Sequence, residues 1–231
     1  MRRLVLLDLD GTLVGGGVGR RALDRAFLAR YGWERATSGV SFAGMTDPGI
    51  VAAVFGRFGR ADAAAEQRAL LADYVRELGA LLAACEASPV HALPGAAAYL
   101  ARLSGAARYE VAVLTGNVEG GARLKLRAAG LGDGFFRVGA FGDDATTRPG
   151  LLPVALARAN ALLTPGAPAW RAAECVVVGD TPRDIEVARA HGARAVAVAS
   201  GACSRAELDA HAPDVLLDAL EPLEEALAAL D

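Results

Sequence analysis

The sequence is poor in lysine and cysteine, and it has no long apolar run. Lys125 is the only lysine among 24 basic residues, so chemistry that needs a lysine elsewhere in the chain is excluded. The three cysteines lie far apart without a CxxC pair, and no signal peptide is recognised. We interpret this as reduced thiols in a cytoplasmic protein. No apolar stretch approaches the length that crosses a membrane, so no membrane partner is expected.

The charge balance gives no reason to expect a nucleic acid partner. The formal net charge is −3, and arginines are spread along the chain rather than clustered. A basic field of the kind that attracts nucleic acid is therefore missing. Hydrophobic residues make up 53% of the 231 residues, which is ample for a packed core in one large domain or in two unequal ones.

Short apolar runs alternate with stretches of helical spacing along most of the chain. The runs are Leu4–Leu7, Val111–Leu114, Val138–Phe141, Cys175–Val178, Ala195–Ala199 and Val215–Leu217. The helical stretches are roughly residues 119–129, 151–163, 183–191 and 204–211. This alternation predicts an α/β fold with a doubly wound, mostly parallel sheet and helices on both of its faces.

A long gap without a strand pattern separates the first apolar run from the second. Helical patterns in this gap run from about Arg20 to Tyr31, after Pro48, and through residues 61–87. The apolar stripe of the last pattern, interpreted as packing, consists of Leu70, Leu71, Tyr74, Leu78, Leu81 and Cys85.

The gap predicts a helical domain inserted into the α/β domain. We expect residues 1–14 and 92–231 to form the core domain and residues 15–91 to form the insert. Gly15–Gly19 and Ser88–Gly95 are the expected hinges, because both are rich in residues that break regular structure.

Polar residues follow the ends of several predicted strands. They are Asp8 and Asp10 in "DLDGT", Thr115, Gly116 and Asn117 in "LTGN", Arg148 in "TTRPG", and Asp180 and Asp184 in "GDTPRD". Any one of them has an ordinary alternative as a turn residue or a helix cap. Ligands bind beyond the carboxyl ends of strands in a doubly wound sheet, so the set together predicts a site at that edge. Four gathered carboxylates repel one another unless a hard cation such as Mg²⁺ lies among them.

These motifs resemble the four motifs of the haloacid dehalogenase superfamily. They occur in the family's order as "DLDGTL", "LTGN", a basic residue before proline in "RPG", and "GDTPRD". The resemblance covers essentially the whole chain, including the helical insert, and is greatest to phosphoglycolate phosphatase-like members. It implies a Rossmann-like core, a helical cap domain and a phosphatase.

The resemblance also implies a role for each carboxylate. Asp8 would attack phosphorus and form an aspartyl-phosphate, and Asp10 would protonate the leaving oxygen and then deprotonate the hydrolytic water. Mg²⁺ would be held by the Asp8 carboxylate, the Asp10 backbone carbonyl and Asp180, with Asp184 in support. Two carboxylates so close together in the sequence are then tolerable.

Other motif residues would contact the phosphoryl group. Thr115 and the backbone N–H of Gly116 would hydrogen-bond its oxygens, and Thr12 and Asn117 are further candidates for substrate binding. The third motif departs from the family, because lysine is typical where this chain has Arg148. Arginine keeps the charge, and we favour Arg148 over Lys125, which lies several residues into the helix after Thr115.

Relatives with other chemistry fit less well. True haloacid dehalogenases lack the second aspartate, here Asp10, and phosphonoacetaldehyde hydrolases need a cap lysine that residues 15–90 do not contain. A small phosphomonoester, phosphoglycolate-like or a sugar phosphate, is therefore the expected substrate. A phosphomutase of the same fold and a catalytically weak protein that binds a phosphorylated ligand are the alternatives. A dinucleotide loop at "GVGRRA" is rejected, because it lacks the tight turn directly after the strand.

The stretch "FAGMTDPGI" in the insert resembles the family's substrate-facing loop. Gly44, Thr46 and Asp47 are candidates for contact with the leaving group. The alternative is a helix start, with Thr46 or Asp47 as the cap before Pro48. The expected partner is a small phosphorylated metabolite, and the protein could be a monomer or a homodimer.

Overall fold

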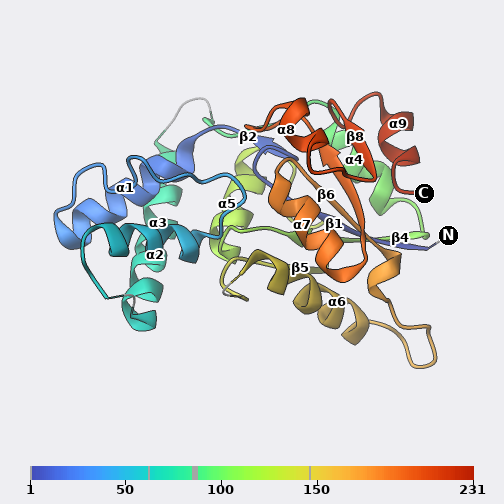
Figure 1. Cartoon of the computed structure of the whole chain (residues 1–231), viewed down its shortest axis with the longest axis horizontal. Helices are drawn as coiled ribbons and strands as arrows, with labels where there is room; N and C mark the ends of the chain where they lie inside the picture. The colour runs from blue at the N-terminus through green and yellow to red at the C-terminus, as the bar shows by residue number, and fades with distance from the viewer. Residues whose placement is uncertain (1, 62, 85–87, 146) are drawn as a thin grey trace.

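A sheet of six parallel strands lies at the centre of the protein (Figure 1). The computed structural model describes residues 2–61, 63–84, 88–145 and 147–231. The strand order is β5-β4-β1-β6-β7-β8. The strands are β1 (Arg3–Leu7), β4 (Tyr109–Leu114), β5 (Val138–Ala140), β6 (Cys175–Gly179), β7 (Arg194–Val198) and β8 (Val215–Leu217). All six predicted strands are present, and the doubly wound α/β fold is confirmed.

Both faces of the sheet are covered by helices, and alternate residues of each strand point to opposite faces. Val5 and Leu7 pack beneath α4 (Ala96–Ser104), α5 (Glu119–Ala128) and α9 (Leu223–Ala228). Leu4 and Leu6 pack beneath α6 (Leu151–Ala161), α7 (Pro182–His191) and α8 (Arg205–Asp209). Burial on both faces explains why the strands are continuous apolar runs rather than alternating ones.

The central strand β1 aligns the functional edge of the sheet. Leu7, the last residue of β1, pairs with Val113 of β4 and with Val178 of β6. The residues that follow these three strands therefore leave the sheet side by side, at its carboxyl edge.

Three helices form a second layer, the cap, beyond this edge (Figure 1). They are α1 (Val18–Tyr31), α2 (Asp47–Arg57) and α3 (Ala64–Ala83). A short antiparallel pair, β2 (Val14–Gly15) and β3 (His91–Ala92), joins the cap to the core. The apolar core is continuous from the sheet into the cap, since Phe27 and Leu78 belong to the same buried cluster as Val5.

Some predicted details of the cap differ from the structure. The first cap helix begins at Val18 rather than Arg20, so Gly19 lies within a helix instead of a hinge. The pair β2 and β3 and the core helices α4 and α9 have no counterpart in the sequence prediction; the two strands are only two residues each, too short to show a period. Cys85, expected on the apolar stripe of α3, lies outside the described residues. The domain boundaries at 14/15 and 91/92 stay a prediction.

Among the described residues, the helices are all too short or too polar to span a bilayer. The longest, α3, has 20 residues but carries charged side chains along its length.

Candidate active site

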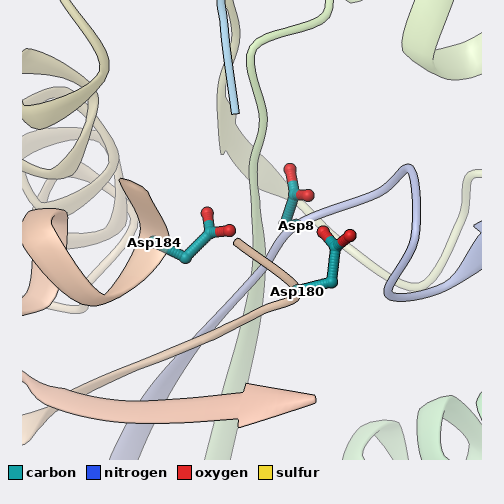
Figure 2. A group of neighbouring side chains, drawn as sticks. All are labelled: Asp8, Asp180 and Asp184. Carbon is teal, nitrogen blue, oxygen red and sulfur yellow. The ribbon is translucent and has the colours of Figure 1, made fainter. Parts of the chain in front are cut away.

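Three carboxylates meet at the carboxyl edge of the sheet (Figure 2). Asp8 directly follows β1, Asp180 directly follows β6, and Asp184 lies in the first turn of α7. All three are buried, and each offers an oxygen within 4.8 Å of the others. The structure thus brings together the predicted residues of the first and fourth motifs, which are more than 170 positions apart in the chain.

Arg148 lies beside this carboxylate cluster in a short 3-10 helix (Arg148–Gly150). Its Nη2 is 2.7 Å from Asp8 Oδ1 and 2.5 Å from Asp184 Oδ1, and its Nε donates to the same Asp184 oxygen at 3.1 Å. Burial opposes the charge of Arg148, but the Asp184 and Asp8 carboxylates raise its pKa above the ordinary value. The structure therefore places Arg148 beside Asp8 and Asp184, and its role as the third-motif cation stays a prediction.

One arginine does not compensate three buried carboxylates. Burial raises the pKa of Asp8 to about 6, although Arg148 lowers it. Burial, with the Asp8 and Asp184 charges added, raises the pKa of Asp180 to about 8. Asp180 Oδ1 is also buried without a hydrogen-bond partner among the described residues. A free oxygen in an acidic cluster is what a bound cation would satisfy, so these residues fit a metal site.

Asp184 is held more completely than its neighbours. Its Oδ2 accepts hydrogen bonds from the Thr181 backbone N–H at 3.1 Å and from Thr181 Oγ1 at 2.7 Å, while its Oδ1 accepts from Arg148. The bond from the Thr181 backbone N–H belongs to the capping box that starts α7. Both Asp184 oxygens are therefore hydrogen-bonded, to Thr181 and to Arg148, and the supporting role of Asp184 at a metal stays a prediction.

Two glycines allow the chain to close tightly around Asp180. A Cβ at Gly11 would lie 2.1 Å from Asp180 Oδ2, and Gly11 has a φ of +86° that disfavours other residues. A Cβ at Gly201, in the loop after β7, would lie 1.6 Å from the same oxygen. Gly201 was not predicted from the sequence, because nothing local marks a glycine 21 residues beyond Asp180.

Asp10 has entirely different surroundings from Asp8. Its side chain is 45% exposed, and its Oδ2 lies 2.6 Å from Lys125 Nζ. Asn117 Nδ2 donates to the same oxygen at 2.8 Å, and Lys125 Nζ donates to Asn117 Oδ1 at 2.7 Å. The Asp10 carboxylate is therefore bound by Lys125 and Asn117, and Lys125 lies beside Asp10 rather than in the third motif.

Thr115 and Asn117 form one hydrogen-bonded unit after β4. Thr115 donates its backbone N–H to Ala140 O at 3.0 Å, and its Oγ1 accepts from Asn117 Nδ2 at 2.9 Å. Both side chains are buried at the wall of a cavity of about 540 Å³ that Asp8, Asp10 and Gly116 also line. A small ligand in this cavity would touch the predicted second-motif residues.

The cap loop packs directly against the core. A Cβ at Gly116 would lie 2.1 Å from Met45 O, and the Asp47 backbone N–H donates to Gly116 O at 2.7 Å. Asp47 Oδ2 accepts from the Val118 N–H at 2.9 Å, at the start of α5, and Thr46 Oγ1 accepts from the Gly49 N–H at 3.1 Å. Thr46 is thus the N-cap of α2, while Asp47 joins the cap to the core at the cavity wall.

The other two predicted binding residues differ in placement. Gly44 lines the cavity at a φ of +63°, where a Cβ would lie 2.6 Å from Arg183 Cδ. Thr12 is fully buried, and its Oγ1 has no hydrogen-bond partner among the described residues. Within the described part of the chain, neither Thr12 nor Thr46 belongs to the cavity lining.

The cap wall of the cavity contains residues that the sequence analysis did not single out. Arg20 Cζ lies 4.0 Å from the centre of the Phe42 ring. The Arg20 guanidinium also donates to the backbone oxygens of Thr37 and Val40 at 2.6 and 2.8 Å. Tyr74, predicted as packing, is buried and also lines the cavity. In the sequence, the only feature that marks Arg20 is its place directly after the glycine-rich stretch, and this is a weak signal for a cavity residue.

A family model described as haloacid dehalogenase-like hydrolase matches residues 5–189. The chain belongs to this family. The family resemblance and the hydrolase class expected from the sequence motifs are thereby confirmed. No curated protein matches the chain in sequence.

Solved structures resemble this haloacid dehalogenase-like hydrolase over nearly its whole length. CbbY from Rhodobacter sphaeroides, in complex with phosphate, shares 23% identity and a TM-score of 0.74, with 96% of each chain covered. A mutant of CbbY in complex with xylulose-(1,5)-bisphosphate gives the same identity and TM-score over 100% of both chains. A predicted phosphoglycolate phosphatase from Haemophilus somnus 129pt shares 16% identity and a TM-score of 0.68 over 98% of each chain. At these identities the likeness establishes the fold of both core and cap.

Proposed function

We propose that the protein is a Mg²⁺-dependent phosphatase that hydrolyses a small phosphomonoester through an aspartyl-phosphate on Asp8. The main support for this proposal is that the two aspartates of the first motif, Asp8 and Asp10, have different partners. Asp8 lies in a buried acidic cluster with Arg148, whereas Asp10 stands half-exposed at the cavity wall beside Lys125. Two carboxylates with such different partners suit two different roles. The expected cellular setting is the cytoplasm, and the expected ligand is a phosphorylated metabolite.

In the first step, an Asp8 oxygen attacks phosphorus and the ester P–O bond breaks. Asp10 gives a proton to the leaving oxygen, and Asp8 carries the phosphoryl group. Mg²⁺, held by Asp8 and Asp180, would supply positive charge against the phosphoryl oxygens. Asp184 holds Arg148 so that its guanidinium remains beside Asp8 while charge develops.

In the second step, Asp10 takes a proton from water and the water oxygen attacks the phosphoryl group. The bond to Asp8 breaks, inorganic phosphate leaves, and both aspartates return to their starting states. Thr115 and the Gly116 backbone N–H stand at the same cavity wall and would hydrogen-bond the phosphoryl oxygens in both steps.

The cavity supports a small substrate. The cavity has a volume of about 540 Å³, and the cap loop at Gly44 and Met45 forms part of its wall. Similarity of fold to CbbY, which was solved with phosphate and with xylulose-(1,5)-bisphosphate, supports a phosphorylated ligand. We propose a phosphoglycolate-like or sugar phosphate ester.

The test is phosphate release from para-nitrophenyl phosphate and a panel of small phosphomonoesters, with and without Mg²⁺. Turnover is expected only with the metal, and Asp8→Asn is expected to abolish it, because an amide cannot serve as the nucleophile. Asp218→Asn is the matched control, since Asp218 is an exposed carboxylate in the ion pair with Arg205. A folded wild-type protein that releases no phosphate from any ester would contradict the proposal and favour a binding role. Transfer that depends on a bisphosphate would favour a phosphomutase.

A further inference from the structure

We infer that Lys125, together with Asn117, is a positioning residue for Asp10, an inference that rests on the proposed function. Lys125 and Asn117 hold one oxygen of the Asp10 carboxylate, so that the other oxygen is presented to the leaving group. Lys125 thus serves the acid–base carboxylate and has no part in the third motif.

The geometry separates the two cations of the site. Arg148 contacts Asp8 and Asp184, while Lys125 Nζ lies 2.6 Å from Asp10 Oδ2 and 2.7 Å from Asn117 Oδ1. Each cation therefore pairs with a different aspartate of "DLDGT". Lys125 is 5% exposed, and a buried ammonium is stable only when it is paired in this way.

The hydrogen bonds also distinguish the two oxygens of Asp10. Oδ2 accepts from both Lys125 Nζ and Asn117 Nδ2, and no described residue donates a hydrogen bond to Oδ1. Asn117 is itself fixed, since its Nδ2 also lies 2.9 Å from Thr115 Oγ1. A carboxylate held from one side by two donors has a defined orientation, which proton transfer requires.

The cap completes this arrangement. A Cβ at Gly19, in the first turn of α1, would lie 3.5 Å from Lys125 Nζ and 3.5 Å from Tyr74 Oη. Cap helix α1 therefore lies against the ammonium group, and the Lys125–Asp10 pair forms at the contact between cap and core. The chain places its single lysine at this point.

The first experiment compares leaving groups. An alkyl phosphate needs a proton on its leaving oxygen, whereas para-nitrophenolate leaves without one. Lys125→Met is therefore expected to lower kcat/KM for an alkyl phosphomonoester by about 100-fold and that for para-nitrophenyl phosphate by less than about 5-fold. Lys125→Arg keeps a charged donor and is expected to recover at least about 10-fold of the alkyl phosphate loss. Equal losses on both substrates would overturn the inference.

Two controls decide whether the effect acts through Asp10. Arg127→Met removes a cation of the same helix that pairs with Asp133, and it is expected to leave both rates unchanged. In an Asp10→Asn background, Lys125→Met is expected to cost less than about 3-fold, because the residue that it positions is already lost. A loss as large as in the wild-type background would show an independent role.

A second measurement needs no turnover. With labelled lysine, the single side-chain ammonium of the protein can be observed alone by NMR. We expect a slowly exchanging Lys125 signal that shifts or is lost in Asp10→Asn and stays in place in Asp133→Asn. An unchanged signal in Asp10→Asn would overturn the ion pair. If the wild type hydrolyses no ester, the proposed function and the catalytic part of this inference fail together. The ammonium signal still tests the Lys125–Asp10 ion pair by itself.

Discussion

Asp8 and Asp10 are two residues apart, yet the site gives them opposite surroundings. Asp8 is buried with Asp180, Asp184 and Arg148, and burial raises its pKa to about 6. Asp10 is 45% exposed and bound by Lys125 and Asn117. The surroundings of a carboxylate, set by the strand ends and helices next to it, therefore decide which role it can take.

The largest expected effect comes from removing the cation of the Asp8 side. Arg148→Met leaves Asp8 and Asp184 facing each other without compensation, and we expect kcat to fall by about 10³-fold. Steady-state kinetics on the best panel substrate at saturating Mg²⁺ measure this. Arg205→Met, which breaks the exposed pair with Asp218, is the control. A fall in kcat of less than about 10-fold would show that the group around Asp8 and the group around Asp10 are less distinct than their contacts indicate.

A smaller effect on activity should be confined to the predicted metal site at Asp8, Asp180 and Asp184. Gly201→Ala places a methyl group 1.6 Å from the present position of Asp180 Oδ2, so the carboxylate must move. We expect the Mg²⁺ concentration for half-maximal activity to rise by about 10- to 100-fold. Gly134→Ala, where nothing lies within 4 Å of the added Cβ, is the matched control. The NMR signal of the Lys125 ammonium group should be unchanged, and a change would contradict the separation of the predicted metal site from the Lys125–Asp10 pair.

The smallest effect concerns stability on the Lys125 side. Burial raises the pKa of Asp47 to about 6, although Lys125 and the Val118 N–H lower it. A raised pKa means that the folded state binds a proton more tightly than the unfolded chain, so this group's stabilisation is complete below about pH 4 and is lost as the pH rises through about 6.

Asp47→Asn should remove this dependence, because an amide carries no charge and can still accept from the Val118 N–H. In urea titrations, the variant should gain about 2 to 3 kcal/mol relative to wild type between pH 4 and pH 7.5. A constant difference across this range would be evidence against a buried charge at Asp47. Asp133→Asn, at a partly exposed ion pair, is the control.

The sequence alone was sufficient for the strands and for the motif residues of the core. Apolar runs of three to five residues need burial on both faces, so they predicted the parallel sheet directly. Parallel strands end at one edge, and Asp8, Thr115 and Asp180 were therefore expected together. The short pair β2 and β3 could not be predicted, because two residues in each strand carry no period.

Contacts between cap and core were beyond the sequence. Thr46 and Asp47 both fitted a helix start, and only the packed structure shows that Thr46 caps α2 while Asp47 binds the Val118 N–H of the core. Arg20 and Gly201 gave no usable local signal, since their importance arises from residues far away in the chain.

Periodicity and motif order can be recognised in the sequence, so the fold class followed from the sequence and the motifs named the candidate groups of the site. Tertiary structure decided which cation serves which carboxylate. The sequence favoured Arg148 over Lys125 as the third-motif cation but predicted no partner for Lys125; in the structure α5 carries Lys125 to Asp10, while the turn before α6 carries Arg148 to Asp8. Ion pairing depends on distances of a few ångströms, and only the packing of helices on the sheet sets those distances.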